Sequence, residues 1–184
     1  LETMERTEDA IGAFDEVVRR YGDRTENAIM EQVLRALLQK GLLLAETGHH
    51  EKAISSLDLV IKETGKPAVS AMSLYHVGAI VEKSLVLIRL KRIKEATSVF
   101  SRLFEDDALL SECFNPIMDR IIEFLAQGYE EEVLQLLTQT PAETKLEPLV
   151  VAIKMMLGQE FNAPQEVVEV AKDVVQRIDE KRTD

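Results

Sequence analysis

The chain is poor in the residues that stabilise small disulfide-linked or aromatic-cored domains. Its 184 residues include one cysteine, Cys113, no tryptophan, and an aromatic fraction of 5%. A single cysteine excludes an internal disulfide and is compatible with a reducing compartment. The scarcity of aromatic residues favours packed helices over a β-sandwich, whose strands are usually rich in aromatic and β-branched residues. We therefore expect a core of leucine, isoleucine, valine, alanine and methionine.

Positive charge and long apolar segments are also scarce. With 22 basic and 33 acidic residues the net charge is −11, so a phosphate backbone or an anionic lipid surface would repel the chain. No apolar run reaches the ~20 residues of a membrane-spanning helix, and the N-terminal residues lack the pattern of a signal peptide. We expect a soluble, cytoplasmic protein that binds neither nucleic acid nor membranes.

Motifs of nucleotide-binding and hydrolytic enzymes are missing: the sequence has no G-x-x-x-x-G-K-[ST], G-x-G-x-x-G, G-x-S-x-G or H-E-x-x-H. His49 and His50 precede Glu51, but no further ligand follows at helical spacing, which favours a polar turn over a metal site. His76 has no acid on its own helix face to orient it. Cys113 has no neighbouring base, which indicates a structural thiol. We predict no catalytic residue, no metal and no cofactor.

Internal repetition is the strongest positive signal. A shift of 43 residues aligns segments 8–22 and 51–65 with six identities in fifteen positions, and a third copy continues from Ala96. The identities are Glu8/Glu51, Ala10/Ala53, Ile11/Ile54, Asp15/Asp58, Val17/Val60 and Gly22/Gly65. A fourth, weaker copy follows after 37 residues, with Gly128 at the position of Gly48. Such self-similarity is typical of a helical repeat array.

Each copy has the apolar spacing of a helical hairpin. The second helix of the first copy carries one apolar stripe, made of Ala10, Ile11, Phe14, Val17 and Val18. Gly22 and Gly65 stand where a left-handed residue is predicted to end these second helices. The first helices of the next two copies are predicted at 26–47 and 68–90, and are apolar on several sides, as suits a helix packed between neighbours.

Further on, Asn115-Pro116 has the pattern of a helix start, so the helix there is predicted to break near Cys113. Three glutamates from Glu130 are predicted to open the next helix, because carboxylates favour the positive end of the helix dipole. Pro148 is best tolerated in an opening turn and is predicted to delay the start of the helix around it.

The C-terminal segment predicts two helices, at 143–157 and 164–181. The second has an apolar side made of Val167, Val168, Val170, Ala171, Val174, Val175 and Ile178. One apolar and one polar side suit a helix that closes the end of a repeat array. We therefore predict an array over 1–141 and a helical cap over 142–184 that packs on it.

The stretch from Leu37 to Gly65 resembles a tetratricopeptide repeat. Gly41 stands at the close-contact position of the first helix, and Ala53 and Leu57 at the matching small and large positions of the second. The resemblance implies an all-α right-handed superhelix of about four helical hairpins with a C-terminal capping helix pair. It also implies protein–protein interaction without catalysis.

The same resemblance implies which side chains line the concave groove, once Gly41, Ser84 and Ile121 are taken as equivalent. The groove residues are Arg35, Leu38, Leu42, Ala45 and Glu46, then Val81, Leu85, Ile88 and Arg89, then Asn115, Met118 and Ile122. Family members that grip a chaperone's C-terminal carboxylate use Lys, Asn and Arg at sites that are apolar here, so no carboxylate clamp is expected. The groove suits a partner helix or apolar peptide. The alternative is that these residues only cover one another.

A basic cluster follows at a predicted turn, made of Arg89, Lys91, Arg92 and Lys94. It is either a solvated turn whose charge favours the preceding helix C-terminus or a docking spot for an acidic partner.

Two functions remain open. The chain is either a scaffold that binds a protein or peptide, or a regulatory or oligomerising arm of a larger multidomain protein such as a bacterial signalling ATPase. The start at Leu1 and the missing first helix of the first copy are expected of a fragment of a longer polypeptide. The apolar face near Ile11 and Val18 would then lack a neighbour, which leaves it available for homo-oligomer formation.

Overall fold

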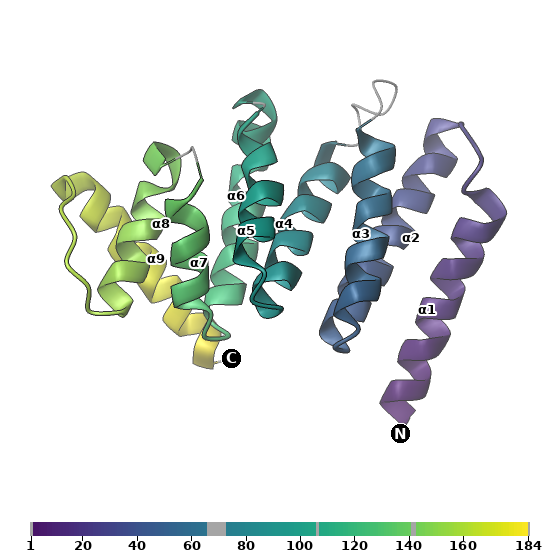
Figure 1. Cartoon of the computed structure of the whole chain (residues 1–184), viewed down its shortest axis with the longest axis horizontal. Coiled ribbons are helices and arrows are strands. Elements are labelled where there is room, and N and C mark those ends of the chain that lie inside the picture. The colour runs from purple at the N-terminus through teal and green to yellow at the C-terminus, as the bar shows by residue number, and fades with distance from the viewer. Residues whose placement is uncertain (1, 66–72, 106, 141–142, 184) are drawn as a thin grey trace. The chain divides into compact units, whose positions relative to one another are not determined.

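A computed structural model describes residues 2–65, 73–105, 107–140 and 143–183 of the chain. Within these ranges every regular element is a helix (Figure 1). The predicted all-α class is confirmed. No helix in the described ranges is both long enough and apolar enough to cross a membrane.

The chain divides into two compact units, Leu1–Val86 and Leu87–Asp184. The first holds α1 (Glu2–Tyr21), α2 (Asn27–Glu46), α3 (His50–Thr64) and most of α4 (Ser73–Arg89). The second holds the end of α4, then α5 (Ile93–Phe100), the 3₁₀ helix η2 (Ser101–Phe104), α6 (Asp107–Leu125), α7 (Glu130–Thr138), α8 (Glu143–Met156) and α9 (Gln165–Thr183). The division lies inside α4, away from residue 141, and the array and cap ranges stay a prediction.

In the first unit, α2 and α3 meet through a glycine. A Cβ atom on Gly41 would lie 2.9 Å from both Cγ and Cδ2 of Leu57, closer than side chains pack. Leu57 is fully buried, and beside it the Ser56 hydroxyl donates a buried 2.8 Å hydrogen bond to the Leu37 carbonyl. The predicted close-contact role of Gly41 against Leu57 is confirmed.

Three hairpin turns share one unusual backbone conformation. The φ angle is 79° at Gly48, 58° at Lys91 and 90° at Gly128. These are the positions that the repeat aligns. After the first two, the amide of the next residue donates to a helix carbonyl five residues back, from His49 at 2.8 Å and from Arg92 at 2.9 Å. The equivalence of these turns is confirmed, and Lys91 is a side-chain-bearing residue in a conformation that favours glycine.

We expect Lys91→Gly to raise the free energy of unfolding by about 1 kcal/mol relative to Lys91→Ala, because only glycine relieves the left-handed strain. Both variants lose the exposed ion pair of Lys91 with Glu132, so the comparison cancels that contribution. Urea denaturation of the two variants measures the difference. Equal midpoints would show that this turn carries no strain.

The predicted left-handed ends at Gly22 and Gly65 are wrong. Gly65 has φ −72° and ψ −3°, and Gly22 is not among the glycines with positive φ. Their amides donate to the carbonyls four residues back, and a Cβ on Gly22 would lie 2.6 Å from the Val18 oxygen. At Gly22 the tight last turn leaves no room for a side chain, so close approach to the backbone accounts for the glycine.

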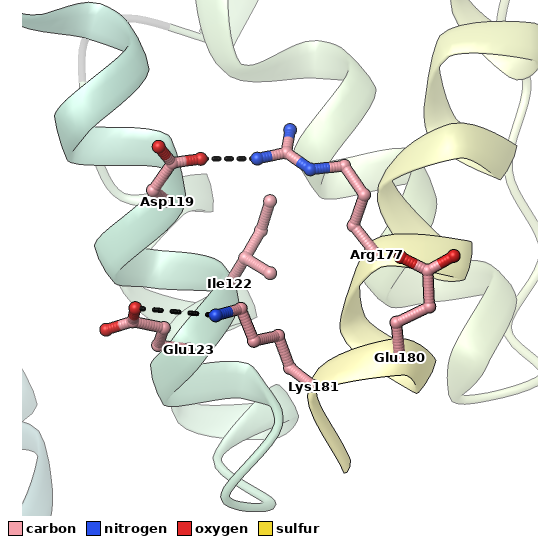
Figure 2. Close-up of a pocket in the computed structure, with 6 residues that line it drawn as sticks. All are labelled: Asp119, Ile122, Glu123, Arg177, Glu180 and Lys181. Atoms are coloured by element: carbon pink, nitrogen blue, oxygen red, sulfur yellow. Dashed lines mark hydrogen bonds and ion pairs between the residues drawn. The ribbon is translucent and has the colours of Figure 1, made fainter. Parts of the chain in front are cut away.

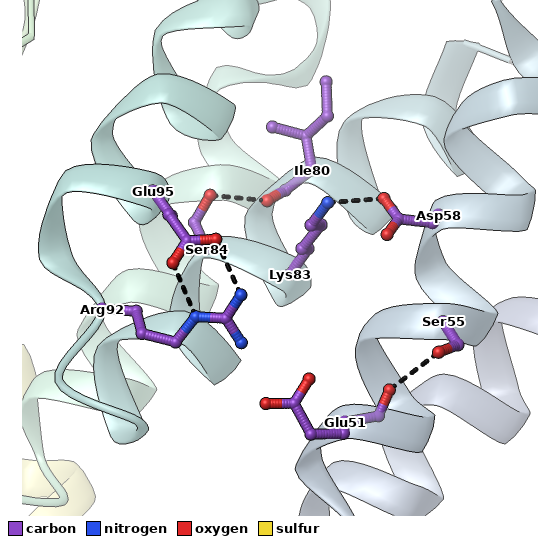
Figure 3. Close-up of polar contacts among 8 residues, drawn as sticks. All are labelled: Glu51, Ser55, Asp58, Ile80, Lys83, Ser84, Arg92 and Glu95. Carbon is purple, nitrogen blue, oxygen red and sulfur yellow. Dashed lines mark hydrogen bonds and ion pairs between the residues drawn. The ribbon is translucent and has the colours of Figure 1, made fainter.

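Two ion pairs repeat with the sequence. Lys40 pairs with Asp15, and Lys83 pairs with Asp58 at 2.5 Å (Figure 3). In both pairs the partners are 25 residues apart, and the second pair is the first displaced by 43 residues. Each joins a second helix to the first helix of the following copy. Because the carboxylates are half-exposed, each pair contributes at most ~1 kcal/mol.

The second helices of the second and third copies have equivalent buried positions but different ends. Leu57 and Phe100 are both buried, at 0% and 1% exposure. However, α3 stays α-helical to Thr64, whereas its counterpart becomes 3₁₀ from Ser101. The Ser101 hydroxyl donates to the Thr97 carbonyl at 2.8 Å, a bond that competes with the helical backbone.

Both proline predictions are corrected by the structure. α6 continues through Pro116, although proline cannot donate the helical backbone bond and costs ~3 kcal/mol in a helix interior. The side chains on either side, Cys113 and Ile117, are buried at 0% and 3% exposure, so packing holds the helix together. α8 begins at Glu143, ahead of Pro148, so this proline does not delay its start.

The last helix buries a narrower stripe than predicted. Ala171, Val174 and Ile178 are buried, at 0–3% exposure. Val170, predicted on the same side, is 52% exposed. α9 packs on α8 and also on α6, within the second unit.

Candidate functional site

The structure separates the predicted groove residues into covered and accessible sets. The covered ones are Ala45, Val81, Leu85, Ile88, Met118 and Ile122, each at most 8% exposed. The accessible ones are Arg35, Leu38, Leu42, Glu46, Arg89 and Asn115. Four of the six accessible residues belong to α2. For the covered residues, burial favours the alternative in which they pack against their neighbours.

The accessible α2 residues form one connected face, which we name the α2 surface: Arg35, Leu38, Leu42 and Glu46. Leu38 and Leu42 are half-buried and one helical turn apart, so their side chains lie on the same side of α2. Arg35 and Glu46 are exposed at either end. This side of α2 therefore has an apolar middle between two charged ends.

α4 borders the α2 surface within the first unit. A Cβ atom on Gly78 would lie 3.5 Å from Cδ2 of Leu38, so the two helices approach each other there. The Tyr75 hydroxyl donates to Glu31 Oε1 at 3.2 Å. Burial and the negative charge of Glu31 raise the pKa of Tyr75, so the phenol stays protonated at neutral pH and acts as a hydrogen-bond donor.

His76 has a structural contact. The Thr64 hydroxyl donates to the Val60 carbonyl at 2.6 Å and lies 2.7 Å from Nδ1 of His76. A His76 tautomer with its hydrogen on Nδ1 satisfies both contacts, because the hydroxyl has a single proton to donate. His76 thereby joins the end of α3 to α4.

A hollow of about 330 Å³ lies between α6 and α9 in the second unit (Figure 2). Its lining residues are Asp119, Ile122 and Glu123 from α6, and Arg177, Glu180 and Lys181 from α9. Arg177 pairs with Asp119, and Lys181 Nζ lies 3.9 Å from Glu123. Basic side chains of α9 are thus paired with acidic side chains of α6.

Part of the predicted groove, at Ile122, is covered by α9. Ile122 lines the hollow and is only 2% exposed, and α9 crosses the same face of α6. Arg182 of α9 also pairs with Glu130, the first residue of α7. In the second unit, α9 therefore packs on the helix that carries Ile122, one of the predicted groove residues. The sequence signal for it is the spacing of Arg177 and Lys181, one turn apart like Asp119 and Glu123.

A second hollow, of about 510 Å³, lies among α1, α2 and α3. Lys40, Lys52 and His49 contribute to its walls together with Glu8, Ile11 and Asp15. The Asp15–Lys40 ion pair is part of its lining. One of its basic groups, Lys40, is therefore already paired with a carboxylate of the same unit.

The His49-His50 pair occupies the turn predicted for it. Nδ1 of His49 lies 3.2 Å from the Thr47 hydroxyl. Nδ1 of His50 is buried and makes no hydrogen bond with the described residues. Across the described part of the chain, no group of three or more His, Cys, Asp and Glu side chains is arranged to hold a metal ion.

Much of the basic cluster is engaged within the second unit. Arg89 lies 5.1 Å above the ring of Phe124 and donates to Gln127 at 2.9 Å. Lys91 pairs with Glu132, which raises the pKa of the lysine and lowers that of the glutamate. Arg92 makes two 2.7 Å hydrogen bonds with Glu95 (Figure 3). These contacts favour a solvated turn over an acidic docking spot.

Cys113 is buried, and burial together with the nearby Glu112 carboxylate raises the pKa of its thiol. The thiolate needed for nucleophilic chemistry is therefore disfavoured. The predicted structural role agrees with this environment.

No protein-family model, curated protein or solved structure matches the chain. The fold itself defines an all-α protein with repeated helical hairpins. The resemblance to tetratricopeptide repeats is based only on the residues of this sequence.

Proposed function

We propose that the chain is a non-catalytic, tetratricopeptide-like module that binds a partner protein through a helix laid along α2. The observation that carries this proposal is the α2 surface. Leu38 and Leu42 are half-exposed apolar side chains one turn apart, between the exposed charges of Arg35 and Glu46. An amphipathic helix binds such a surface with apolar residues at i, i+3, i+4 and i+7 spacing.

The charges at the two ends give the surface a direction. Arg35 and Glu46 are eleven residues apart on α2, which is ~16 Å along a helix. A partner helix with an acidic residue at one end and a basic residue at the other satisfies both charges in only one orientation. The charges therefore select orientation, and the two leucines supply most of the affinity.

Helical peptides selected from a displayed library for binding to the intact chain test this proposal. We expect the selected peptides to lose 30-fold or more in affinity for Leu38→Glu/Leu42→Glu, since two anchors of a few kcal/mol in total are removed (roughly tenfold per 1.4 kcal/mol). Leu59→Glu is the matched control, because Leu59 is a 45% exposed leucine of α3 and does not belong to the α2 surface. Selected peptides that bind the double variant and the control equally well would reject this surface.

The alternative, an oligomerising arm of a larger multidomain protein, is favoured by one observation on α1. None of its described residues from 6 to 21 is buried, although the helix carries the same apolar stripe as α3.

A further inference from the structure

Within the described residues, one face of α1 is accessible where the corresponding face of α3 is covered. Four positions of α3 are at most 9% exposed, whereas the same four positions of α1 are half-buried or exposed. They are Ala53, Ser56, Val60 and Thr64 on α3, and Ala10, Ala13, Val17 and Tyr21 on α1. We name the latter four the open α1 face. Tyr21 is 43% exposed, against 9% for its counterpart Thr64.

The difference comes from a helix that covers α3 on this side. Ser56 of α3 donates to the Leu37 carbonyl of α2, and Leu57 packs on Gly41 of the same helix. α2 also borders the other side of α1, where Lys40 reaches Asp15. The open α1 face therefore points away from α2. The unpartnered face predicted near Ile11 and Val18 is thus shifted toward Ala13 and Tyr21, and Ile11 lines the hollow with α3.

The charges of α1 complement those of an identical helix that runs antiparallel to it. Glu8 and Asp9 lie near its beginning, and Arg19 and Arg20 lie near its end. A parallel copy would place like charges together, whereas an antiparallel copy places each acidic end beside a basic end. Asp9 and Arg20 are eleven residues apart, about three helical turns, so they share one flank of the helix.

The chain is nearly balanced in charge over the described side chains of α1 and the turn that follows it. The whole chain carries −11, but residues 6–24 hold four arginines against five carboxylates. Arg20 already pairs with Glu16, and a guanidinium with five donors can bind a second carboxylate. The small side chains of Ala10 and Ala13 allow a second helix to approach closely.

We propose that a second copy of the chain covers the open α1 face, with the two α1 helices antiparallel and Asp9 of each beside Arg20 of the other. This association is independent of partner binding to the α2 surface. One pair of helices of this length buries less than the ~1,600 Å² of a standard stable interface, so the dimer is expected to be weak and to form at high micromolar concentration.

Sedimentation equilibrium of the intact chain, with two charge-reversal variants, tests the proposal. We expect the wild type to dimerise, and Asp9→Arg and Arg20→Asp each to weaken dimerisation at least tenfold. An equimolar mixture of the two variants is expected to recover the wild-type dimer. In the mixed dimer each introduced charge meets an opposite one, whereas each variant alone places like charges together.

A second pair of variants tests whether the two copies meet through the open α1 face or through another side of α1. Ala13→Glu places a charge in the open α1 face and is expected to abolish dimerisation. Gly12→Glu adds the same charge one residue away, where a new Cβ would have no heavy atom of the described structure within 4 Å, and is expected to dimerise normally. Circular dichroism checks that both variants keep their helices.

Three results would overturn the proposal. A wild type that stays monomeric to millimolar concentration would leave the open face without a second copy. A dimer unaffected by Ala13→Glu would place the contact on another surface. A variant mixture that stays monomeric while the wild type dimerises would exclude the antiparallel pairing.

Discussion

Leu57→Ala is expected to lower the free energy of unfolding of the first unit by about 2–5 kcal/mol, because it empties a fully buried position between α2 and α3. Gly41→Ala in the natural chain is expected to lower it by about 1–2 kcal/mol. The new Cβ would lie 2.9 Å from Leu57, and the strain of overpacking exceeds the ~1 kcal/mol that alanine gains over glycine in a helix.

The double variant Gly41→Ala/Leu57→Ala tests whether the loss at Gly41 comes from its contact with Leu57. With Leu57 shortened, the atoms that obstruct a side chain at Gly41 are gone, so adding Gly41→Ala to Leu57→Ala is expected to be neutral or to restore about 1 kcal/mol. Gly12→Ala is the control, since the open space there leaves only the gain in helix propensity. Urea denaturation followed by circular dichroism measures the four variants and the wild type. Strictly additive losses at Gly41 and Leu57 would show that the two residues are not in contact.

Phe100→Ala is expected to destabilise the second unit by about 3–5 kcal/mol, because the ring is 1% exposed and also packs edge-on against Phe104, with centroids 5.7 Å apart. Phe100→Leu is expected to cost less than about 1.5 kcal/mol, since the repeat places leucine at the equivalent position 57.

Phe161→Ala serves as the control for this pair, because Phe161 is 39% exposed and its loss is expected to cost at most about 0.5 kcal/mol. Thermal or urea unfolding of the second unit gives the three values. A loss for Phe100→Leu as large as that for Phe100→Ala would contradict the equivalence of the two copies.

The helical hairpins could be predicted from the sequence because they depend on local spacing. Apolar residues at helical intervals locate α2 and α3 to within one residue, whereas α1 begins at Glu2, six residues before the aligned segment 8–22. The resemblance to a tetratricopeptide repeat was enough to pair Gly41 with Leu57. The repeat also placed the turn at Gly128 correctly. Each of these inferences needs only residues that are near in the chain or one repeat apart.

The errors have a different origin, in contacts that periodicity does not describe. A stripe of apolar residues identifies a face of a helix but not what covers it. For Ile122 both an open groove and cover by other groove residues were therefore left open, and neither alternative included α9, which packs on α6. In the same way, the signal of Asn115-Pro116 for a helix start is local, and the burial of Cys113 and Ile117 on either side outweighs it.

The predictions at Gly22 and Gly65 failed for a different reason. Glycine at the end of a helix usually indicates a left-handed residue, but it is also the only residue that fits when the last turn closes tightly on a carbonyl. The chain uses glycine in both of these ways. Gly48 and Gly128 need positive φ, whereas Gly22 needs the absence of a Cβ. Sequence alone does not distinguish the two uses.

The buried thiol of Cys113 gives the protein a natural reporter of its own opening. It is the only cysteine in the chain, and it belongs to the second unit. A thiol reagent can react with it only while α6 is transiently exposed, so the alkylation rate measures how often that unit opens, without any label being introduced. The first unit has no thiol and stays silent, so the alkylation rate reports on the second unit alone.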